Sequence, residues 1–282
     1  MINKSPLPIK TSCNLLNAST SGYYSWTKKV STDNDEKICN QIRIIAEEYP
    51  KYGYRRVYHQ LKRNGITCNT KRIRRIMKEE NLLVKQKKKG PVTTQSNHGF
   101  KKPENLIKDL EIYTINQVFV ADITYIRLEK DFVYLALIMD LCSRRVVGWE
   151  LSRNPDTQLT LGALNRAIKL RGKTNLKGCI HHSDNGVQYA SNLYVMRLGD
   201  LGMLPSMGEI GNSYDNAHAE SLNKTIKNEE VWMNEYETFE MAYLNIENFI
   251  EEVYNKKRLH SSIGYVPPIE FEKSIIMEQR ET

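Results

Sequence analysis

The stretch that most limits the fold begins at Gln117, where three apolar runs follow one another with only short turns between them. The runs cover residues 118–128, 132–139 and 146–151, and this arrangement is typical of an antiparallel meander. Helical and strand patterns then alternate. Helices are expected over 157–170, 191–201, 216–229 and 239–258, and short strands over 178–182 and near Leu204. The order predicts an α/β fold, with a mixed sheet covered by helices.

The segment before this sheet has a different pattern, because residues 33–83 are predicted to form three short helices. The first repeats isoleucine at helical spacing, and the second ends at Asn64-Gly65, which is a helix stop signal. The third, Lys71 to Glu80, has a narrow apolar stripe and is otherwise cationic. Short helices joined by tight turns, with a cationic last helix, indicate a helix-turn-helix.

Charge is divided unequally along the 282 residues. Residues 1–102 hold 22 basic and 7 acidic side chains, a net of +15, whereas the remainder holds 19 basic and 26 acidic ones, a net of −7. This split indicates two modules, the first of which faces a polyanion such as DNA. The expected DNA contacts are Arg55, Arg56, Lys71, Arg72, Arg74, Arg75 and Lys78.

Composition excludes several other classes. No apolar run approaches the ~20 residues that a membrane span needs, and no apolar stretch follows the first lysine as in a secretory signal. The five cysteines are scattered and never form a Cys-x-x-Cys pair, which argues against a disulfide framework or a zinc knuckle. We therefore expect a cytoplasmic protein without a membrane partner; the family resemblance given below further implies association with the nucleoid when the protein is bound to DNA.

Three acidic residues occupy positions suited to chemistry. Asp122 lies inside the first apolar run, where a carboxylate is costly to bury unless a cation or donor meets it. Asp184 follows a short strand and precedes the turn Asn185-Gly186, at the strand end where open α/β sheets place ligands. Glu220 lies on a predicted helix whose face also carries Lys224 and Lys227.

Carboxylates with no cysteine and little histidine nearby suit a hard cation, Mg²⁺ or Mn²⁺ rather than zinc. Two such ions could support an in-line phosphoryl displacement. Asp122, Asp184 and Glu220 are therefore candidate metal ligands, and Lys224 and Lys227, beside Glu220, would meet the phosphates of the substrate.

Other polar residues near these motifs have simpler explanations. Asp140 is expected to cap the turn at residues 142–145, and Asp215 to cap the following helix. Of His181 and His182, one is expected to be packed and the other to reach the edge of the site. The segment Arg258-Leu259-His260 is either a structural helix end or a DNA contact.

Several ordered motifs resemble one family. Asp184 and Glu220 are separated by 35 residues, as in the Asp, Asp-(35)-Glu signature of retroviral integrases and many bacterial transposases. The sequence motifs around these acids resemble those of the second-frame transposase of the IS-three insertion-sequence family. The motif Tyr-Gly-Tyr-Arg-Arg-Val (52–57) resembles the helix-turn-helix of that family, and the N-terminal segment resembles its counterpart there. The core motifs are Asp-Ile-Thr-Tyr-Ile (122–126), Asp-Leu-Cys-Ser-Arg-Arg-Val-Val-Gly-Trp (140–149), His-Ser-Asp-Asn-Gly-Val-Gln-Tyr (182–189), Gly-Asn-Ser-Tyr-Asp-Asn-Ala-His-Ala-Glu-Ser (211–221) and Tyr-Asn-Lys-Lys-Arg-Leu-His (254–260).

The resemblance implies a ribonuclease-H-like integrase core, a mixed five-stranded sheet with flanking helices, preceded by a small all-α helix-turn-helix domain. It implies metal-dependent cleavage at element ends, with Asp122, Asp184 and Glu220 in the catalytic metal-binding positions, followed by transfer of the 3′-hydroxyl into target DNA. The implied partners are double-stranded DNA, further copies of the chain on DNA, and the upstream first-frame product as a fusion or partner. The expected divisions are an N-terminal segment (1–32), a helix-turn-helix domain (33–83), a basic linker (84–110) and a catalytic domain with a C-terminal helical extension (111–282).

Two alternatives remain open at this point. A catalytically inactive DNA-binding repressor of the element would need the helix-turn-helix but not the three acids. A ribonuclease-H-like host nuclease would need the acids but not the basic N-terminal module.

Overall fold

The computed structural model describes residues 6–27, 33–84, 103–208 and 216–281, and the chain divides into two compact units, Met1–Lys85 and Gln86–Thr282. Most of the basic linker expected over 84–110, namely residues 85–102, lies outside the described residues, and so does Asp215. No helix among the described residues is long and apolar enough to cross a membrane.

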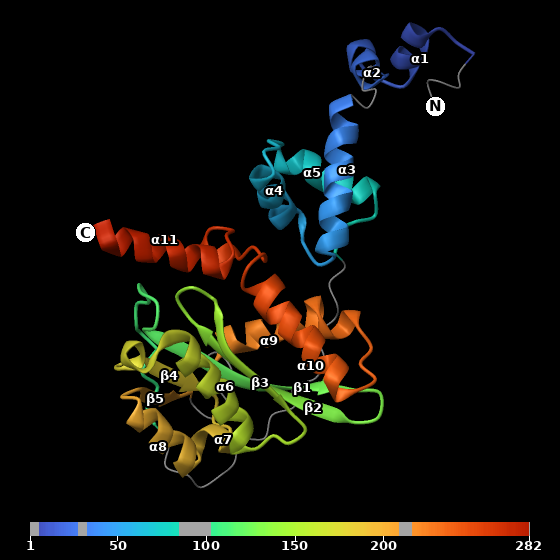
Figure 1. Cartoon of the computed structure of the whole chain (residues 1–282). Helices are drawn as coiled ribbons and strands as arrows, with labels where there is room; N and C mark the ends of the chain where they lie inside the picture. The colour runs from blue at the N-terminus through green and yellow to red at the C-terminus, as the bar shows by residue number, and fades with distance from the viewer. Residues whose placement is uncertain (1–5, 28–32, 85–102, 209–215, 282) are drawn as a thin grey trace. The chain divides into compact units, whose positions relative to one another are not determined.

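In the described residues of the first unit, 6–27 and 33–84, the regular elements are all helices (Figure 1). Its helices are α1 (Ile9–Leu15), α2 (Thr20–Thr27), α3 (Asp33–Glu48), α4 (Tyr54–Arg63) and α5 (Thr70–Glu79). The last three share a small core, because each has an apolar stripe at helical spacing that it must bury. The core residues of these three helices are Ile38, Ile42, Ile45, Val57, Leu61, Ile73, Ile76 and Met77.

Helix α5 begins where the sequence predicts, since the side chain of Asn69 accepts a hydrogen bond from the Lys71 backbone N–H at 2.8 Å. Its basic face is tied to α3 through Asp35, whose carboxylate pairs with both Arg72 and Arg75. The guanidinium groups of Arg72 and Arg75 hold the pKa of Asp35 below its usual value, although burial acts in the opposite direction.

The second unit is built on a five-stranded sheet with the strand order β3-β2-β1-β4-β5. The strands are β1 (Val118–Arg127), β2 (Phe132–Asp140), β3 (Val146–Ser152), β4 (Ile180–Ser183) and β5 (Leu204–Met207). The first three form the predicted antiparallel meander, and β4 and β5 run parallel to β1. The sheet is therefore mixed, as expected, and β1 lies at its centre.

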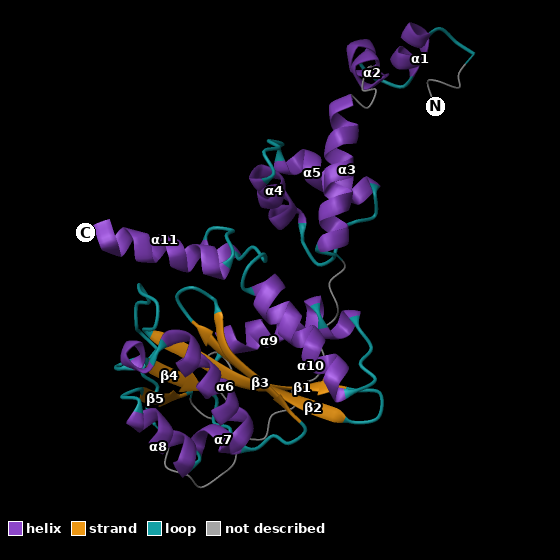
Figure 2. Ribbon diagram, viewed as in Figure 1, coloured by secondary structure: helices purple, strands orange, loops and turns teal. Residues whose placement is uncertain are grey.

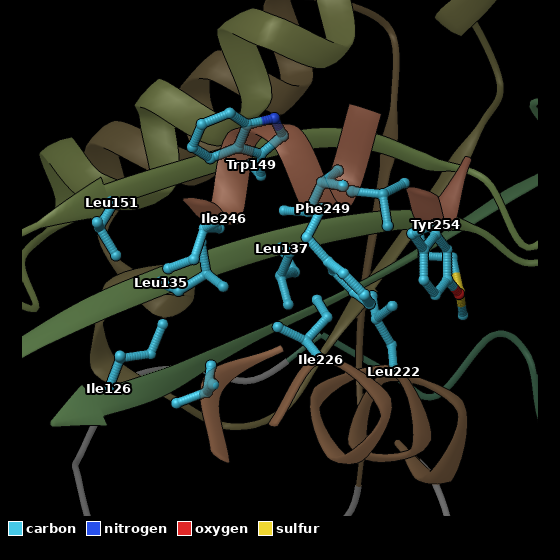
Figure 3. Packing of buried hydrophobic residues seen from close by; sticks show 14 of the residues in the cluster. Ile126, Leu135, Leu137, Trp149, Leu151, Leu222, Ile226, Ile246, Phe249 and Tyr254 are labelled. Carbon is cyan, nitrogen blue, oxygen red and sulfur yellow. The ribbon is translucent and has the colours of Figure 1, made fainter. Parts of the chain in front are cut away.

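Helices cover both faces of the sheet (Figure 2). The helices of this unit are α6 (Thr157–Arg171), α7 (Val187–Ala190), α8 (Asn192–Asp200), α9 (Ala217–Glu229), α10 (Phe239–Asn248) and α11 (Pro268–Glu281), of which α11 contributes to neither apolar cluster of the sheet. One apolar cluster joins the sheet to α9 and α10, with Leu137, Trp149 and Phe249 at its centre (Figure 3). A second cluster joins the opposite face to α6 and α8. Strand β1 contributes alternate residues to both, so it is buried on its two faces.

The helix predicted over residues 239–258 differs from this extent in the structure. The α-helix α10 ends at Asn248, and a wider helical turn follows over Phe249–Tyr254. Immediately after this turn the amide side chain of Asn255 bonds the backbone N–H and C=O of Val146, both at 3.0 Å. These bonds satisfy backbone groups at the start of the edge strand β3. Such a contact between distant segments cannot be deduced from helical periodicity.

Helix α11 is fixed to the rest of the unit by a buried ionic cluster around Glu272. The Glu272 carboxylate accepts hydrogen bonds from Ser143 and Arg145, each at 2.7 Å, and also pairs with Arg171 at the end of α6. Burial raises the pKa of Glu272, but the two arginines outweigh that effect and hold it below its usual value.

The contact between β3 and α6 depends on a glycine. A Cβ atom at Gly148 would lie 2.1 Å from the backbone oxygen of Ala163 and 3.1 Å from the Cβ of Ala167. The strand and the helix thus approach through small residues. By contrast, a Cβ at Gly199, on α8, would meet nothing within 4 Å.

We predict that Gly148→Ala lowers the free energy of unfolding by about 1–3 kcal/mol, because the helix backbone must move away from the strand. Gly199→Ala is the matched control, and it should be neutral or stabilise by up to about 1 kcal/mol. Urea unfolding of the full chain measures both. Equal effects of the two substitutions would contradict the close contact.

Candidate active site

Asp122 lies in the middle of the central strand β1 and points toward α9. The alternation of a strand puts Asp122 on the same face as Val118 and Val120, which belong to the cluster packed against α9. Its Oδ1 accepts a hydrogen bond from the Ile123 backbone N–H at 2.9 Å, and its Oδ2 accepts one from Nδ2 of Asn223 at 2.7 Å. The half-buried carboxylate therefore has neutral donors but no basic partner among its hydrogen bonds.

Asp184 is brought beside Asp122 by strand register. Strands β1 and β4 are parallel, and Ala121 pairs with Ser183, so the two acids follow at the same end of neighbouring strands. The Asp184 Oδ1 accepts a hydrogen bond from the Gly186 backbone N–H at 3.1 Å, within the predicted turn. The expected position at the carboxyl end of a sheet strand is confirmed.

Glu220 lies on α9, and the start of this helix is attached directly to β1. Asn216, immediately before α9, donates from Nδ2 to the backbone oxygen of Ala121 at 3.1 Å. Asn223, one turn after Glu220, bonds Asp122. Glu220 is exposed between these two anchors, in the first turn of α9. The helix therefore presents its carboxylate at the same end of the sheet as the two aspartates.

The other end of α9 is fixed by Arg258. Its guanidinium donates to both carboxylate oxygens of Glu229, at 2.6 and 2.7 Å, and Arg258 is only 3% exposed. Bidentate pairs of this kind impose a defined orientation. Of the two explanations for Arg258-Leu259-His260, the structure supports the structural one, because the arginine is occupied with Glu229.

The three acids influence one another electrostatically. Burial raises the pKa of Asp122 to about 7, and the negative charges of Asp184 and Glu220 contribute to the rise. The hydrogen bonds from Ile123 and Asn223 act in the opposite direction and only partly offset it. A carboxyl group with this environment is stabilised in its charged form by an added cation.

The groups around the acids could serve a hard cation. The side-chain oxygens Oδ1 of Asn216 and Oδ1 of Asn223, and the hydroxyl of Tyr189, are buried and have no hydrogen-bond partner within the described part of the chain. Within that same part, no three His, Cys, Asp or Glu side chains converge tightly enough to hold one ion. The donor set is nevertheless composed of oxygen atoms, which fits Mg²⁺ or Mn²⁺.

Two lysines on α9 have different surroundings. Lys224 is exposed. Lys227 is half-buried, with its Nζ 4.2 Å from the centroid of the Tyr125 ring. Burial lowers the pKa of Lys227, while the charge of Asp122 acts in the opposite direction. Lys227 is thus close enough to the acids to interact with Asp122, as its helical spacing from Glu220 suggests.

The basic residues expected to bind DNA fall into two groups within the first unit. Arg72 and Arg75 are paired with Asp35, as described above. Arg55 and Arg74 instead meet at the ring of Tyr54, with their guanidinium carbons 5.4 and 5.7 Å from its centroid. Arg56 lies over Tyr52, and Lys71 and Lys78 are exposed on the same face of α5 as Arg74.

The remaining acid and histidine candidates are structural. Asp140 is fully buried and accepts backbone hydrogen bonds from Asn116, Cys142 and Ser143, which confirms that it caps the turn. The expectation that His181 or His182 reaches the site edge is wrong. His181 bonds the hydroxyl of Tyr194 and His182 bonds Ser206, both at 2.9 Å, because alternate residues of the interior strand β4 enter opposite cores.

Comparison with known families agrees with this architecture. Residues 113–213 match the model of an integrase core domain, and residues 201–268 match a second model with that description. Residues 33–90 match an HTH-like domain.

The chain also resembles curated proteins over nearly its whole length. It is 36% identical to the insertion element IS600 uncharacterized 31 kDa protein of Shigella sonnei, over 92% of this chain and 96% of that protein. It is 33% identical to the transposase for insertion sequence element IS629 of Shigella sonnei, over 93% and 90%. It is 31% identical to the transposase InsF for insertion sequence IS3A of Escherichia coli strain K12, over 94% and 93%. The chain belongs to the insertion-sequence transposases with an integrase core. The predicted family and the DNA transposase function are thereby confirmed.

Solved structures similar to the transposase include retroviral integrases. The integrase catalytic core domain of HTLV-2 in complex with magnesium has a TM-score of 0.41 and 18% identity, covering 56% of this chain and 95% of that one. The catalytic core domain of BIV integrase has a TM-score of 0.44 and 17% identity, covering 58% and 99%. The family assignment depends on the relatives in sequence and not on these likenesses.

Sequence reasoning places Asn216 on the helix face of Glu220, but it missed the anchoring role of Asn216 and missed Asn223 and Tyr189 altogether. Asn216 and Asn223 anchor α9 to β1, and Tyr189 lies close enough to Asp122 and Asp184 for their charges to raise its pKa further, beyond the effects of burial and Tyr194. One signal was available, because Asn216 and Asn223 lie close to Glu220 on the face of its helix. Nothing in the sequence marks an asparagine there as an anchor.

We predict that Asp122→Asn stabilises the metal-free transposase at pH 8, by roughly 2–4 kcal/mol. The folded pKa of about 7 lies above the ordinary value of 3.8. Between these pH values the folded state therefore keeps a proton that the unfolded chain has released, and stability falls as pH rises through the window. Urea unfolding with EDTA at pH 5, 6.5 and 8 should show the advantage of the variant growing with pH. An advantage independent of pH would contradict the coupling.

Proposed function

We propose that this transposase cleaves the ends of its insertion sequence and joins the freed 3′-hydroxyl to target DNA in a divalent-metal-dependent reaction. Asp122, Asp184 and Glu220 are the catalytic residues in this proposal. The observation that supports it most directly is the electrostatic coupling of Asp122 to both other acids at one end of the sheet.

Both proposed steps break a phosphodiester bond by displacement at phosphorus, and they differ in the attacking group. In the first, water attacks the phosphorus at the element end, and the bridging 3′ oxygen leaves as a hydroxyl. In the second, that 3′-hydroxyl attacks a target phosphodiester, whose own bridging 3′ oxygen leaves. Two Mg²⁺ or Mn²⁺ ions held by the three carboxylates would supply activation of the attacking oxygen and stabilisation of the leaving one.

The protein's own part is to position and neutralise the DNA. The anchors Asn216 and Asn223 would keep Glu220 facing the aspartates, and Lys224 and Lys227 would offset phosphate charge next to them. The helix-turn-helix unit would hold the element end through its basic residues. Because two ends must be joined, at least two copies acting together on DNA are part of the proposal, with the upstream first-frame product as a further partner.

The substitutions Asp184→Asn and Glu220→Gln should each reduce strand transfer by more than about 100-fold, the upper range for loss of a residue that only supports metal ligands. The assay uses a labelled duplex of the inverted repeat that flanks the gene, with Mg²⁺ or Mn²⁺. Glu235→Gln, an exposed carboxylate in a loop, is the control and should leave the rate unchanged.

Full activity of either variant would show that the substituted acid is not a catalytic residue. A wild-type chain that binds the repeat without metal, and cleaves it with neither ion, would instead be the DNA-binding repressor. Cleavage without preference for the repeat would indicate a general nuclease.

Salt dependence should separate the two groups of basic residues on α5. The combined substitution of Lys71, Arg74 and Lys78 by Gln should flatten the plot of log affinity against log salt by about 2.7, or 0.9 for each phosphate that the protein no longer neutralises. Arg75→Gln is the control, because its guanidinium is held by Asp35 and Glu79. Fluorescence anisotropy over a salt series measures both. Equal slope changes would place the DNA-binding residues elsewhere.

A further inference from the structure

An exposed aromatic pair lies on the β1–β2 hairpin, beginning three residues beyond Asp122 along β1, and has no role in the proposal so far. Tyr125 of β1 is 56% exposed and Phe132 of β2 is 49% exposed. Their ring centroids are 5.8 Å apart, with the ring planes at 77° to each other. Large aromatic side chains of the same sheet, such as Trp149, are buried in the core. This pair therefore leaves apolar surface in water.

Tyr125 lies on the part of β1 that forms an open edge of the sheet beyond Asp122. Strand β4 pairs with β1 only from Val118 to Ala121. Beyond that point the described strands leave residues 122–127 bonded to β2 on one side alone. Tyr125 and Asp122 are an odd number of residues apart and point to opposite faces. At this open edge, however, Lys227 reaches the Tyr125 ring from α9, the helix that packs on the face of Asp122. The Tyr125 ring is therefore in contact with a residue from the Asp122 side of the sheet.

The charge around the ring suits a nucleotide. The Nζ of Lys227 lies 4.2 Å from the Tyr125 centroid, and the side chain of Arg127 is exposed two residues further along the same face of β1. Aromatic rings flanked by cations are the usual means of holding unpaired nucleotides, because the ring stacks on a base while the cation meets the phosphate. An uncharged protein surface could pack on the ring, but it would leave these two cations without a counter-charge.

The distance limits which nucleotide could be held. Three residues of a strand span about 10 Å, so Tyr125 lies about that far along β1 from Asp122. Adjacent nucleotides of one strand rise by about 3.4 Å in duplex DNA. The base that reaches Tyr125 therefore lies within about three nucleotides of the phosphodiester at the acids.

We propose that Tyr125, supported edge-on by Phe132, is a stacking site for one unpaired base of the DNA end, within three nucleotides of the reacting phosphodiester, with Lys227 meeting the phosphate of that nucleotide. This site depends on the proposed function for the location of the phosphodiester. It adds a requirement that the carboxylates do not impose, namely that the end of the duplex opens by at least one base.

The first experiment combines protein and DNA changes. Strand transfer by wild type, Tyr125→Ala and Tyr125→Phe is measured on the flanking repeat, either intact or with a single abasic position among the last three nucleotides of each strand. Tyr125→Ala should lose about 10-fold on intact DNA, as expected for one stacked base. At one position the abasic DNA should abolish the difference between wild type and Tyr125→Ala. Tyr125→Phe should recover most of the loss.

Tyr113→Ala is the matched control, because Tyr113 is 77% exposed and lies outside the site. It should behave as wild type on every DNA. A Tyr125→Ala loss of equal size on all DNAs, or no loss on intact DNA, would overturn the stacking site. A loss that is independent of the abasic position and accompanied by a smaller assembly in light scattering would show that the pair contacts protein instead.

A binding measurement keeps this test independent of catalysis. The base at each of the same positions is replaced in turn by 2-aminopurine, and fluorescence is recorded with Glu220→Gln and with Glu220→Gln/Tyr125→Ala. Bound Glu220→Gln should change the fluorescence at one position, and the double variant should not. Failure of the proposed chemistry would leave this signal intact, whereas the same signal in both proteins would overturn the stacking site alone.

Discussion

Burial of Asp122 in the central strand is the physical constraint on which the rest of the site depends. A carboxylate among apolar residues, with two further acids nearby, has its pKa raised to about 7. Asp122 meets this cost because β1 lies between two apolar layers, which pack against both of its faces. The cost is thus electrostatic, and a cation bound at the site would relieve it. In the proposed function, such a cation would also allow the anionic unit to accept a phosphodiester.

The second requirement is that an exposed glutamate on a helix be held against a strand far from it in sequence. Three contacts along α9 achieve this: Asn216 with the backbone of Ala121, Asn223 with Asp122, and Arg258 with Glu229. Only the last involves two charged partners, and it lies at the end of the helix away from the acids. Neutral amides near the acids leave the carboxylates available, since a basic residue in their place would compete with a bound metal ion.

The sequence predicted the sheet and its meander well, because both depend on local patterns of apolar runs and turn residues. It also indicated where Asp122 and Asp184 lie on the strands, whereas the catalytic role of Asp122, Asp184 and Glu220 stays a prediction. It predicted less well whatever depends on contacts between distant segments. The adjacent histidines of β4, His181 and His182, are both buried. Their partners Tyr194 and Ser206 cannot be deduced from any spacing in the sequence. The basic residues of α5 were treated alike, although Asp35, some 40 residues earlier, pairs with two of them. Likewise, the sequence did not indicate the wider helical turn after Asn248 or the bonds from Asn255 to the distant strand β3.

The most direct test of the account is to locate the divalent ions. Crystals of the full chain bound to its element end and soaked with Mn²⁺ would be measured for anomalous scattering. The account predicts two manganese peaks coordinated by Asp122, Asp184 and Glu220, and their loss in Glu220→Gln from the position that this residue shares. Ordered DNA with no manganese at these carboxylates, or with manganese held by other residues, would contradict it.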